Sequence, residues 1–478
     1  MSSATAPPSS RPPAGPAPST RKRGRAAGAV ALIAVLVCAA VVALWWLRPA
    51  GGPQDPDGES AQSPGGALLS GHVPVSSGIP WPLEGEVRGP RAAITPSDAW
   101  MRGSRSAWAL DTPVGERVPP RYATNGEVLV SLHRNGARTE LMQGWDIRSG
   151  QAQHLWSREL DVGDTLSIQS DDAVWVGGTL FVDGHAINGA TGEAVVLSWM
   201  KAKNPSDSKT LVITPGRVLV VCARTGNECQ ARDSQGNVLW RKSTGLRAEA
   251  EVRGTASLNG EQWIWLQQDN GKSSFVNTST GASNTLEVGT GGLCTDIRAD
   301  DGWLVACGES TQITAFSADG SGRQDFDAAY WPISTRGRSE CSDATVPVWE
   351  RTPTLEQAIA YYRDGDTSAT AGTLTAADCG HLEYRAPGTD DATSIDITND
   401  RWHRAFTLGD FGGELQEQLA VSGSRRILAV GNSMLIDLTS GRLMDLAGAQ
   451  NPQNPRLAAP DLVIAAEDNG IRGAVPRD

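Results

Sequence analysis

The sequence predicts an all-β fold, an eight-bladed β-propeller with seven blades as the alternative, preceded by one N-terminal transmembrane helix. Three observations lead to this prediction. The 478 residues include 53 Gly and 28 Pro without a Gly-X-Y period, a composition too rich in turn formers for a helical bundle or a collagen. A glycine-closed turn recurs about every 42 residues, which is typical of propeller blades. One uncharged apolar run lies close to the N-terminus.

The transmembrane helix is predicted from this run. Ala26 to Leu47 contains no charged residue, and its 22 residues, at about 1.5 Å each, match a hydrocarbon core of roughly 30 Å. A basic cluster, Arg21 to Arg25, precedes the run and Arg48 follows it, so the N-terminus is expected in the cytoplasm. A single-pass plasma-membrane protein then has four parts: a disordered cytoplasmic tail (1–25), the helix (26–47), a flexible linker (48–72) and an extracytoplasmic propeller (73–478).

A cleaved signal peptide is the alternative interpretation of this run. Signal peptides have an apolar core of about 7–15 residues followed by a small-x-small cleavage site. This run is longer and ends in Trp45-Trp46, residues that favour the membrane interface. A lipoprotein site at Cys38 is disfavoured because Val37 occupies the position of a small residue. The sequence therefore favours an uncleaved anchor, with the membrane as one partner of the chain.

Charge is distributed unevenly along the chain. Six of the 42 Lys and Arg residues precede Asp55, while all 54 Asp and Glu residues lie at or after it. The outer part therefore has 36 basic residues and a net formal charge of −18. Such a domain repels nucleic acid and anionic membrane surfaces, so no nucleic-acid partner is expected.

The outer part repeats one structural unit. Each copy contains an apolar strand, a second strand that ends in Asp or Asn, a turn that closes on Gly, and a third strand that often carries Trp. The closing glycines are separated by 42, 44, 45 and 39 residues: Gly150, Gly192, Gly236, Gly281 and Gly320. In four copies an Asp or Asn lies four residues before the Gly: Asp146, Asn188, Asn277 and Asp437. Its side chain is suited to hydrogen-bond the turn backbone, and Gly supplies a positive φ.

Two further copies bring the number of blades to eight. Trp108 to Asp111 followed by Gly115 has the same spacing, and the chain between Gly320 and Gly441 is long enough for one more blade with insertions. The last apolar strands, Leu462 to Ala466 and Gly470 to Val475, lack an outer strand of their own. The segment around Trp108 can supply it, which closes the ring without a free sheet edge.

Six cysteines lie outside the apolar run: Cys222, Cys229, Cys294, Cys307, Cys341 and Cys379. An even number in an oxidising compartment suggests disulfides, although six cysteines allow fifteen pairings. Cys222 with Cys229, and Cys294 with Cys307, flank turn residues almost symmetrically, so each pair can face across an antiparallel hairpin. Cys341 and Cys379 then pair by elimination. No zinc-ligand spacing occurs among these residues, so no metal site is predicted.

The segment between Cys341 and Cys379 contains a predicted amphipathic helix. Thr352 and Pro353 are suited to the N-cap and first helical positions, and apolar residues follow at i, i+3, i+4 and i+7: Leu355, Ala358, Ile359 and Tyr362. We expect this helix, Pro353 to Tyr362, to cover part of one face of the ring. Its outward residues are candidate partner contacts, with a pure packing role as the alternative: Glu356, Gln357 and Arg363.

The repeat resembles that of the PQQ-type β-propellers, the quinoprotein alcohol dehydrogenase-like superfamily. The resemblance rests on a strand, an Asx residue, Thr or Ser before Gly, and then Trp, as in Asp146 to Gly150 followed by Trp156, and covers about residues 80–478. Members that oxidise alcohols hold pyrroloquinoline quinone under a disulfide between adjacent cysteines, with a calcium ion. No two cysteines are adjacent here, so the resemblance implies the non-catalytic branch, which includes envelope assembly lipoproteins, and no cofactor.

No catalytic motif was found in the sequence. The six histidines form no His-Glu-x-x-His pattern, and no Gly-x-Ser-x-Gly occurs. Gly271-Lys272-Ser273 resembles the end of a P-loop, but Leu266 stands where the first Gly is required. We therefore expect a membrane-anchored propeller that binds another envelope component, a protein or a glycan. A propeller hydrolase or lyase is the alternative, and it requires carboxylates or histidines that converge at the channel mouth.

Overall fold

The computed structural model describes residues 68–69, 81–89, 93–111, 120–134, 139–148, 150–161, 166, 168, 173–200, 209–223, 228–243, 250–268, 271–288, 294–307, 312–330, 345–378, 381–396, 419–430, 434–444, 453–467 and 470–478. All of them belong to one compact unit, Gly65–Asp478. Within these residues no helix is both long and apolar enough to cross a membrane. The apolar run Ala26 to Leu47 lies outside them.

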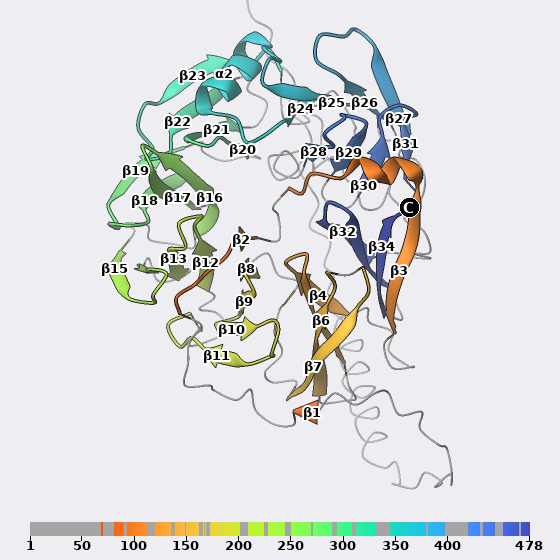
Figure 1. The fold of residues 1–478 in the computed structure, drawn as a ribbon. Coiled ribbons are helices and arrows are strands. Elements are labelled where there is room, and N and C mark those ends of the chain that lie inside the picture. Colours follow the sequence, from red (N-terminus) through yellow and green to blue (C-terminus); the bar gives the residue numbers. More distant parts are fainter. Residues whose placement is uncertain are drawn as a thin grey trace, which may run out of the picture. The chain divides into compact units, whose positions relative to one another are not determined.

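The described strands form eight antiparallel blades (Figure 1). Blades 1 and 2 contain β4 (Arg121–Thr124), β5 (Val128–Arg134), β6 (Thr139–Asp146) and β7 (Gln153–Asp161), then β8 (Val174–Val176), β9 (Thr179–Val182), β10 (His185–Asn188) and β11 (Ala194–Val196). Blades 3 and 4 contain β12 (Lys209–Ile213), β13 (Leu219–Ala223), β14 (Glu228–Arg232) and β15 (Val238–Ser243), then β16 (Ala250–Leu258), β17 (Glu261–Gln268), β18 (Lys272–Asn277) and β19 (Ser283–Glu287).

The second half of the ring has the same order. Blades 5 and 6 contain β20 (Cys294–Arg298), β21 (Gly302–Cys307), β22 (Gln312–Ser317) and β23 (Gln324–Asp327), then β24 (Thr345–Trp349), β25 (Thr370–Asp378), β26 (His381–Arg385) and β27 (Ala392–Asp396). Blades 7 and 8 contain β28 (Leu419–Val421), β29 (Ile427–Val430), β30 (Met434–Asp437) and β31 (Arg442–Leu443), then β32 (Gln453–Ala459), β33 (Leu462–Glu467), β34 (Gly470–Pro476) and β3 (Ser104–Asp111). The predicted blade number of eight, rather than seven, is confirmed.

Blade 8 closes the ring with strands from both ends of the chain. Its sheet order is β32, β33, β34 and β3, and Trp108 of β3 lies opposite Gly473 of β34. The prediction that the segment around Trp108 completes the last blade is therefore confirmed. Two short strands extend other blades: β1 (Leu68–Leu69) pairs with β7 of blade 1, and β2 (Val87–Arg88) pairs with β8 of blade 2.

One apolar core lies between each two neighbouring blades, which gives eight cores in all. Each core contains buried residues of two consecutive blades, and one of them joins blade 8 to blade 1 through Ile464 and Leu129. Middle strands are therefore covered on both sides, which explains why β33 is apolar along nearly its whole length and buried throughout. The hydrophobic pattern of the sequence follows from this arrangement, since every sheet packs between two others.

The repeated turn joins the third and fourth strands of a blade. In blade 2, Asn188 Oδ1 accepts hydrogen bonds from the backbone N–H groups of Ala190 (2.9 Å) and Thr191 (3.2 Å), and Gly192 has a φ of 71°. The ring of Trp156, on the fourth strand of blade 1, lies directly over Gly192, where an added Cβ would be 2.5 Å from it. Trp156 Nε1 also donates to the carbonyl oxygen of Gly189 at 2.8 Å. The Trp and Gly of the repeat thus form one contact between successive blades.

Candidate functional site

The predicted helix in blade 6 is α2 (Leu355–Asp364), between β24 and β25. Thr354 is its N-cap: Thr354 Oγ1 accepts a hydrogen bond from Gln357 N (3.3 Å), and Gln357 Oε1 accepts one from Thr354 N (2.9 Å). The prediction of Thr352 as N-cap and Pro353 as first helical residue was wrong. Thr354 has a Gln three residues later and so forms a reciprocal capping box, while the Pro353 carbonyl accepts a hydrogen bond from Asp300 N (2.7 Å).

One side of α2 is part of the core between blades 5 and 6. Ala358, Tyr361 and Tyr362 are fully buried in an apolar cluster with residues of β21, β22 and β24. The Tyr361 ring stacks on Tyr330 with centroids 5.2 Å apart, and burial raises the pKa of the Tyr361 hydroxyl. At the start of the helix, Leu355 N donates to Asp301 Oδ1 at 2.6 Å. The helix is therefore fixed to blade 5 by apolar and polar contacts.

The three candidate partner contacts lie on the exposed side of α2. Glu356 forms no hydrogen bond or ion pair with another described residue. Gln357 takes part in the capping box, and Arg363 Nη2 pairs with Asp364 Oδ2 at 2.7 Å. The hydrogen bond from Arg363 holds the pKa of Asp364 below its usual value. Glu356 and Arg363 are seven residues apart, so they lie on one side of the helix about 10 Å from each other.

A segment that contacts the same end of the ring as α2 was not predicted from the sequence. Because neighbouring strands are antiparallel, the turn between the first and second strands and the turn between the third and fourth strands lie at the same end of a blade. We call this end of the ring the turn face, and α2 lies on it because it connects the first and second strands of blade 6. The segment before β3 crosses the turn face. We call its described residues, 81–89 and 93–102, the strap.

The first stretch of the strap contacts blades 3, 2 and 1 in turn. Leu83 N donates to the Ser234 carbonyl oxygen of blade 3 at 2.8 Å, and Glu86 O accepts from Gly177 N of blade 2 at 2.9 Å. Val87 and Arg88 form β2 along the edge of β8, as Figure 1 shows. Arg88 Nη1 donates to the Asn125 carbonyl oxygen in the first turn of blade 1.

The second stretch of the strap contacts blades 8 and 7. Ser97 N and Trp100 Nε1 both donate to the Pro460 carbonyl oxygen of blade 8, at 3.0 and 2.8 Å. Asp98 accepts hydrogen bonds from Ser424 of blade 7, and those from Ser422 and Ser424 lower the pKa of the Asp98 carboxyl. Trp100 is buried between these two blades. The strap thus bridges five consecutive blades on both sides of the ring closure.

Two of the predicted disulfides are confirmed. Cys222 and Cys229 lie opposite each other on β13 and β14, with Cα atoms 4.2 Å apart, and Cys294 and Cys307 on β20 and β21, at 4.0 Å. Cys341 and Cys379 lie outside the described residues, and their pairing stays a prediction. Thr345 pairs with Thr375 in the same two strands, and each cysteine is four residues from its member of this pair.

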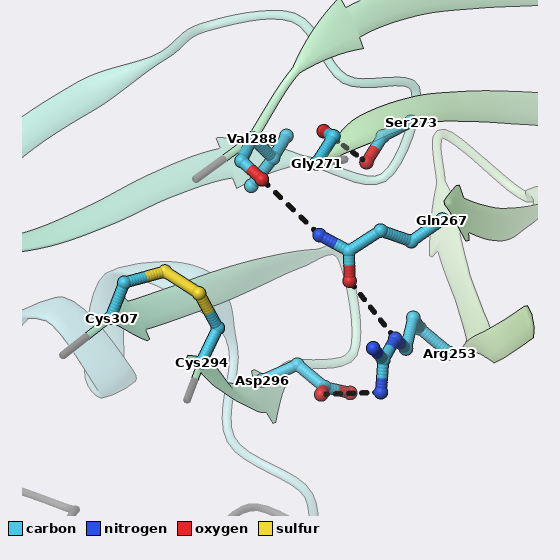
Figure 2. The surroundings of a disulfide bond; sticks show 8 residues. All are labelled: Arg253, Gln267, Gly271, Ser273, Val288, Cys294, Asp296 and Cys307. Atoms are coloured by element: carbon cyan, nitrogen blue, oxygen red, sulfur yellow. Dashed lines mark hydrogen bonds and ion pairs between the residues drawn. A yellow bond between two sulfur atoms is a disulfide. The ribbon is translucent and has the colours of Figure 1, made fainter. Parts of the chain in front are cut away.

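A polar network lies beside Cys294–Cys307 and joins blades 4 and 5 (Figure 2). Arg253 Nη1 is 3.8 Å from Asp296 Oδ1, and Arg253 Nε donates to Gln267 Oε1 at 2.9 Å. Gln267 Nε2 in turn donates to the Val288 carbonyl oxygen at 3.2 Å. The Asp296 carboxylate of blade 5 is thus held by an arginine of blade 4. In the part of the chain that the structure describes, no group of three or more His, Cys, Asp or Glu side chains is placed to hold a metal ion.

Comparisons with known proteins give structural neighbours but no family. No protein-family model and no curated protein sequence matches the chain. It is similar to solved structures of BamB from Moraxella catarrhalis (13% identity, 78% of this chain and 100% of that chain, TM-score 0.38) and of the WD40 domain of SCAP from fission yeast (9%, 78% and 98%, 0.40). At TM-scores below 0.5 these structures assign the chain to no family, and its architecture as an eight-bladed β-propeller follows from its own eight sheets.

Proposed function

We propose that this chain is a single-pass plasma-membrane protein whose extracytoplasmic propeller binds another component of the cell envelope, a protein or a glycan, as a scaffold. The uncharged run Ala26 to Leu47 and the basic cluster before it support the anchor and its orientation. The two disulfides support a location outside the cytoplasm, because disulfides persist in oxidising compartments. The Asx-Gly turns with their Trp contacts support a place in the non-catalytic branch of the PQQ-type propellers.

The observation that carries the binding role is the attachment of α2. Its buried tyrosines and its bond to Asp301 hold the helix rigidly on the turn face, while Glu356, Gln357 and Arg363 remain exposed. Binding residues on rigid elements are positioned more precisely than residues on free loops, and less entropy is lost when a partner orders them. We therefore propose that the exposed side of α2 contacts the partner.

Photocrosslinking in intact cells tests this proposal. A photoreactive amino acid is placed at Glu356, and the control has it at Thr285, an exposed residue of β19 in blade 4. A specific crosslinked product at position 356 but not at position 285 is the expected result. Equal products at both positions, or none at position 356, would refute the assignment of α2 as the contact. Protease added to intact protoplasts tests the topology separately, since it should digest the propeller and spare residues 1–25.

A further inference from the structure

The first stretch of the strap is bound to the ring in the way that a peptide is bound by a receptor. Leu83 is buried and Trp81 and Val87 are half-buried, whereas Gly85 is exposed but lies against Gly177. Leu83 is only 2% exposed, within the core between blades 2 and 3, whereas its neighbours Pro82 and Glu84 are exposed. Val87 and Arg88 lie as an added strand on a sheet edge, and Gly85, with a φ of 99°, bends the chain just before them.

Most hydrogen bonds that hold this stretch come from its backbone. Besides the bonds of Leu83 N and Glu86 O, Arg217 of blade 3 donates to the carbonyl oxygens of Gly85 (3.2 Å) and Leu83 (3.4 Å). Val87 and Arg88 add a strand to the edge of β8. Backbone bonds of this kind do not depend on side-chain identity, so they add affinity for any segment whose side chains fit the site.

Three positions select the sequence that fits. Trp81 lies over Gly236, where an added Cβ would be 2.6 Å from its ring. Leu83 fills the core between two blades. Gly85 is in close contact with Gly177, and a Cβ on Gly85 would lie 2.5 Å from the Gly177 Cα atom, so no larger residue fits there. The site therefore prefers an aromatic residue, a leucine and a glycine at alternate positions.

We infer that this surface of blades 3, 2 and 1, which we call the strap site, is a peptide-binding site that the strap occupies in cis. Its partner is a segment of another polypeptide with an aromatic residue, a leucine and a glycine at alternate positions, which displaces residues 81–88 and adds a short strand to β8. A tethered occupant has an effective concentration of about 1 mM, so the wild-type site binds such a segment weakly. The inference does not depend on α2 or on the membrane anchor, because its contacts involve neither.

The test uses the full chain in detergent and a fluorescent peptide with the sequence of residues 81–89. In the double variant Leu83→Asp/Gly85→Val the strap no longer fits, but the strap site is unchanged. Fluorescence anisotropy should show that the peptide binds this variant at least ~10-fold more tightly than wild type, as expected when a tethered competitor is removed. A peptide with Gly85→Val should not bind. The control variant Glu84→Gln, at an exposed position of the strap, should behave like wild type.

Failure of the peptide to bind the double variant, or equal binding to wild type, would overturn the inference. A second measurement tests the inference if the double variant does not fold. Protease recognition sequences inserted after Pro80 and after Gly89 allow the first stretch of the strap to be excised from the folded protein. This fragment should then dissociate on dilution and be replaced by the labelled peptide. Retention of the fragment after 100-fold dilution, or unfolding of the cut ring, would show a permanent structural strap instead. Glu356→Arg should leave peptide binding unchanged, which separates this outcome from failure of the proposed function.

Discussion

Trp81 of the strap packs over Gly236 of blade 3 as Trp156 packs over Gly192 and Trp240 over Gly281. In the other two contacts the tryptophan comes from the fourth strand of the preceding blade. In blade 2 that strand, β11, ends at Val196 and carries no tryptophan. The strap therefore supplies from outside the repeat the aromatic ring that blade 2 lacks.

Replacement of the Trp81 side chain is expected to destabilise the propeller at blade 3. Trp81→Ala should lower the free energy of unfolding by about 2 kcal/mol, less than the 3–5 kcal/mol of a fully buried Trp because Trp81 is half-buried. Glu84→Ala, at an exposed position of the same stretch, is the control and should change it little. Denaturant unfolding of the two variants measures the difference. Equal stability of both variants would contradict the assigned role of Trp81.

Substitutions at two closing glycines distinguish the energetic cost of backbone strain from the cost of a clash with tryptophan. Gly150 and Gly281 have similar φ angles, 69° and 67°, but a Cβ meets no atom within 4 Å at Gly150 and lies 2.6 Å from the Trp240 ring at Gly281. Gly150→Ala should lower the free energy of unfolding by about 1 kcal/mol, because alanine is strained in the left-handed backbone conformation. Gly281→Ala should cost about 1–3 kcal/mol more, because the ring has to move. Chemical denaturation compares them, and equal costs would mean that the contact adds nothing.

Tyr361 of α2 is expected to respond unusually to loss of its hydroxyl group. This hydroxyl is buried and has no hydrogen-bond partner in the described part of the chain, whereas the Tyr384 hydroxyl donates to the Ala371 carbonyl oxygen at 2.6 Å. Tyr361→Phe should leave stability unchanged or raise it by about 1 kcal/mol, since an unsatisfied polar group is removed. Tyr384→Phe should lower it by about 1 kcal/mol. Calorimetry of the two variants checks the order, and the reverse order would mean that Tyr361 has a polar partner.

The remaining pair of cysteines gives a prediction about disulfides. Denatured, unreduced protein should have no free thiol outside Cys38, and peptide mapping should join Cys341 to Cys379. Removal of the Cys341–Cys379 bridge should lower the free energy of unfolding by about 1.5 kcal/mol more than removal of Cys222–Cys229. The reason is that Cys341–Cys379 closes a longer loop than the pair Cys222–Cys229, whose sequence separation is seven residues. Denaturation of the Cys→Ser pairs compares the costs. A peptide that joins Cys341 to any other cysteine would refute the pairing.

Features that repeat, or that depend on residues close in the sequence, could be predicted from the sequence. The Asx-Gly turns, the two hairpin disulfides and the closure of blade 8 through Trp108 are of this kind. The helix was located correctly, but its start was not, because Thr352 and Thr354 both precede the apolar positions. The reciprocal partner Gln357 distinguishes them, and this Gln was a signal present in the sequence.

The strap could not be predicted in the same way. Residues 81–102 contain no copy of the repeat, and their partners come from turns that lie up to 360 residues away in the sequence. Contacts such as that of Gly85 and Gly177 depend on a close approach between backbones, which no hydrophobic period in the sequence indicates. A weak signal existed in blade 2, where the first Trp after Gly192 is Trp199, beyond the end of β11, while Trp81 precedes the first repeat.

Charge reversal at Glu356 is the most direct test of whether the exposed side of α2 binds the partner. Tagged full-length chains are purified from crosslinked intact cells, and recovery of the partner identified at position 356 is compared between Glu356→Arg and the control Glu287→Arg, an exposed residue of β19. We predict at least a ~10-fold loss of recovery for Glu356→Arg, with an unchanged melting temperature, since charge placement decides which partner is accepted. Equal recovery with both variants would contradict it.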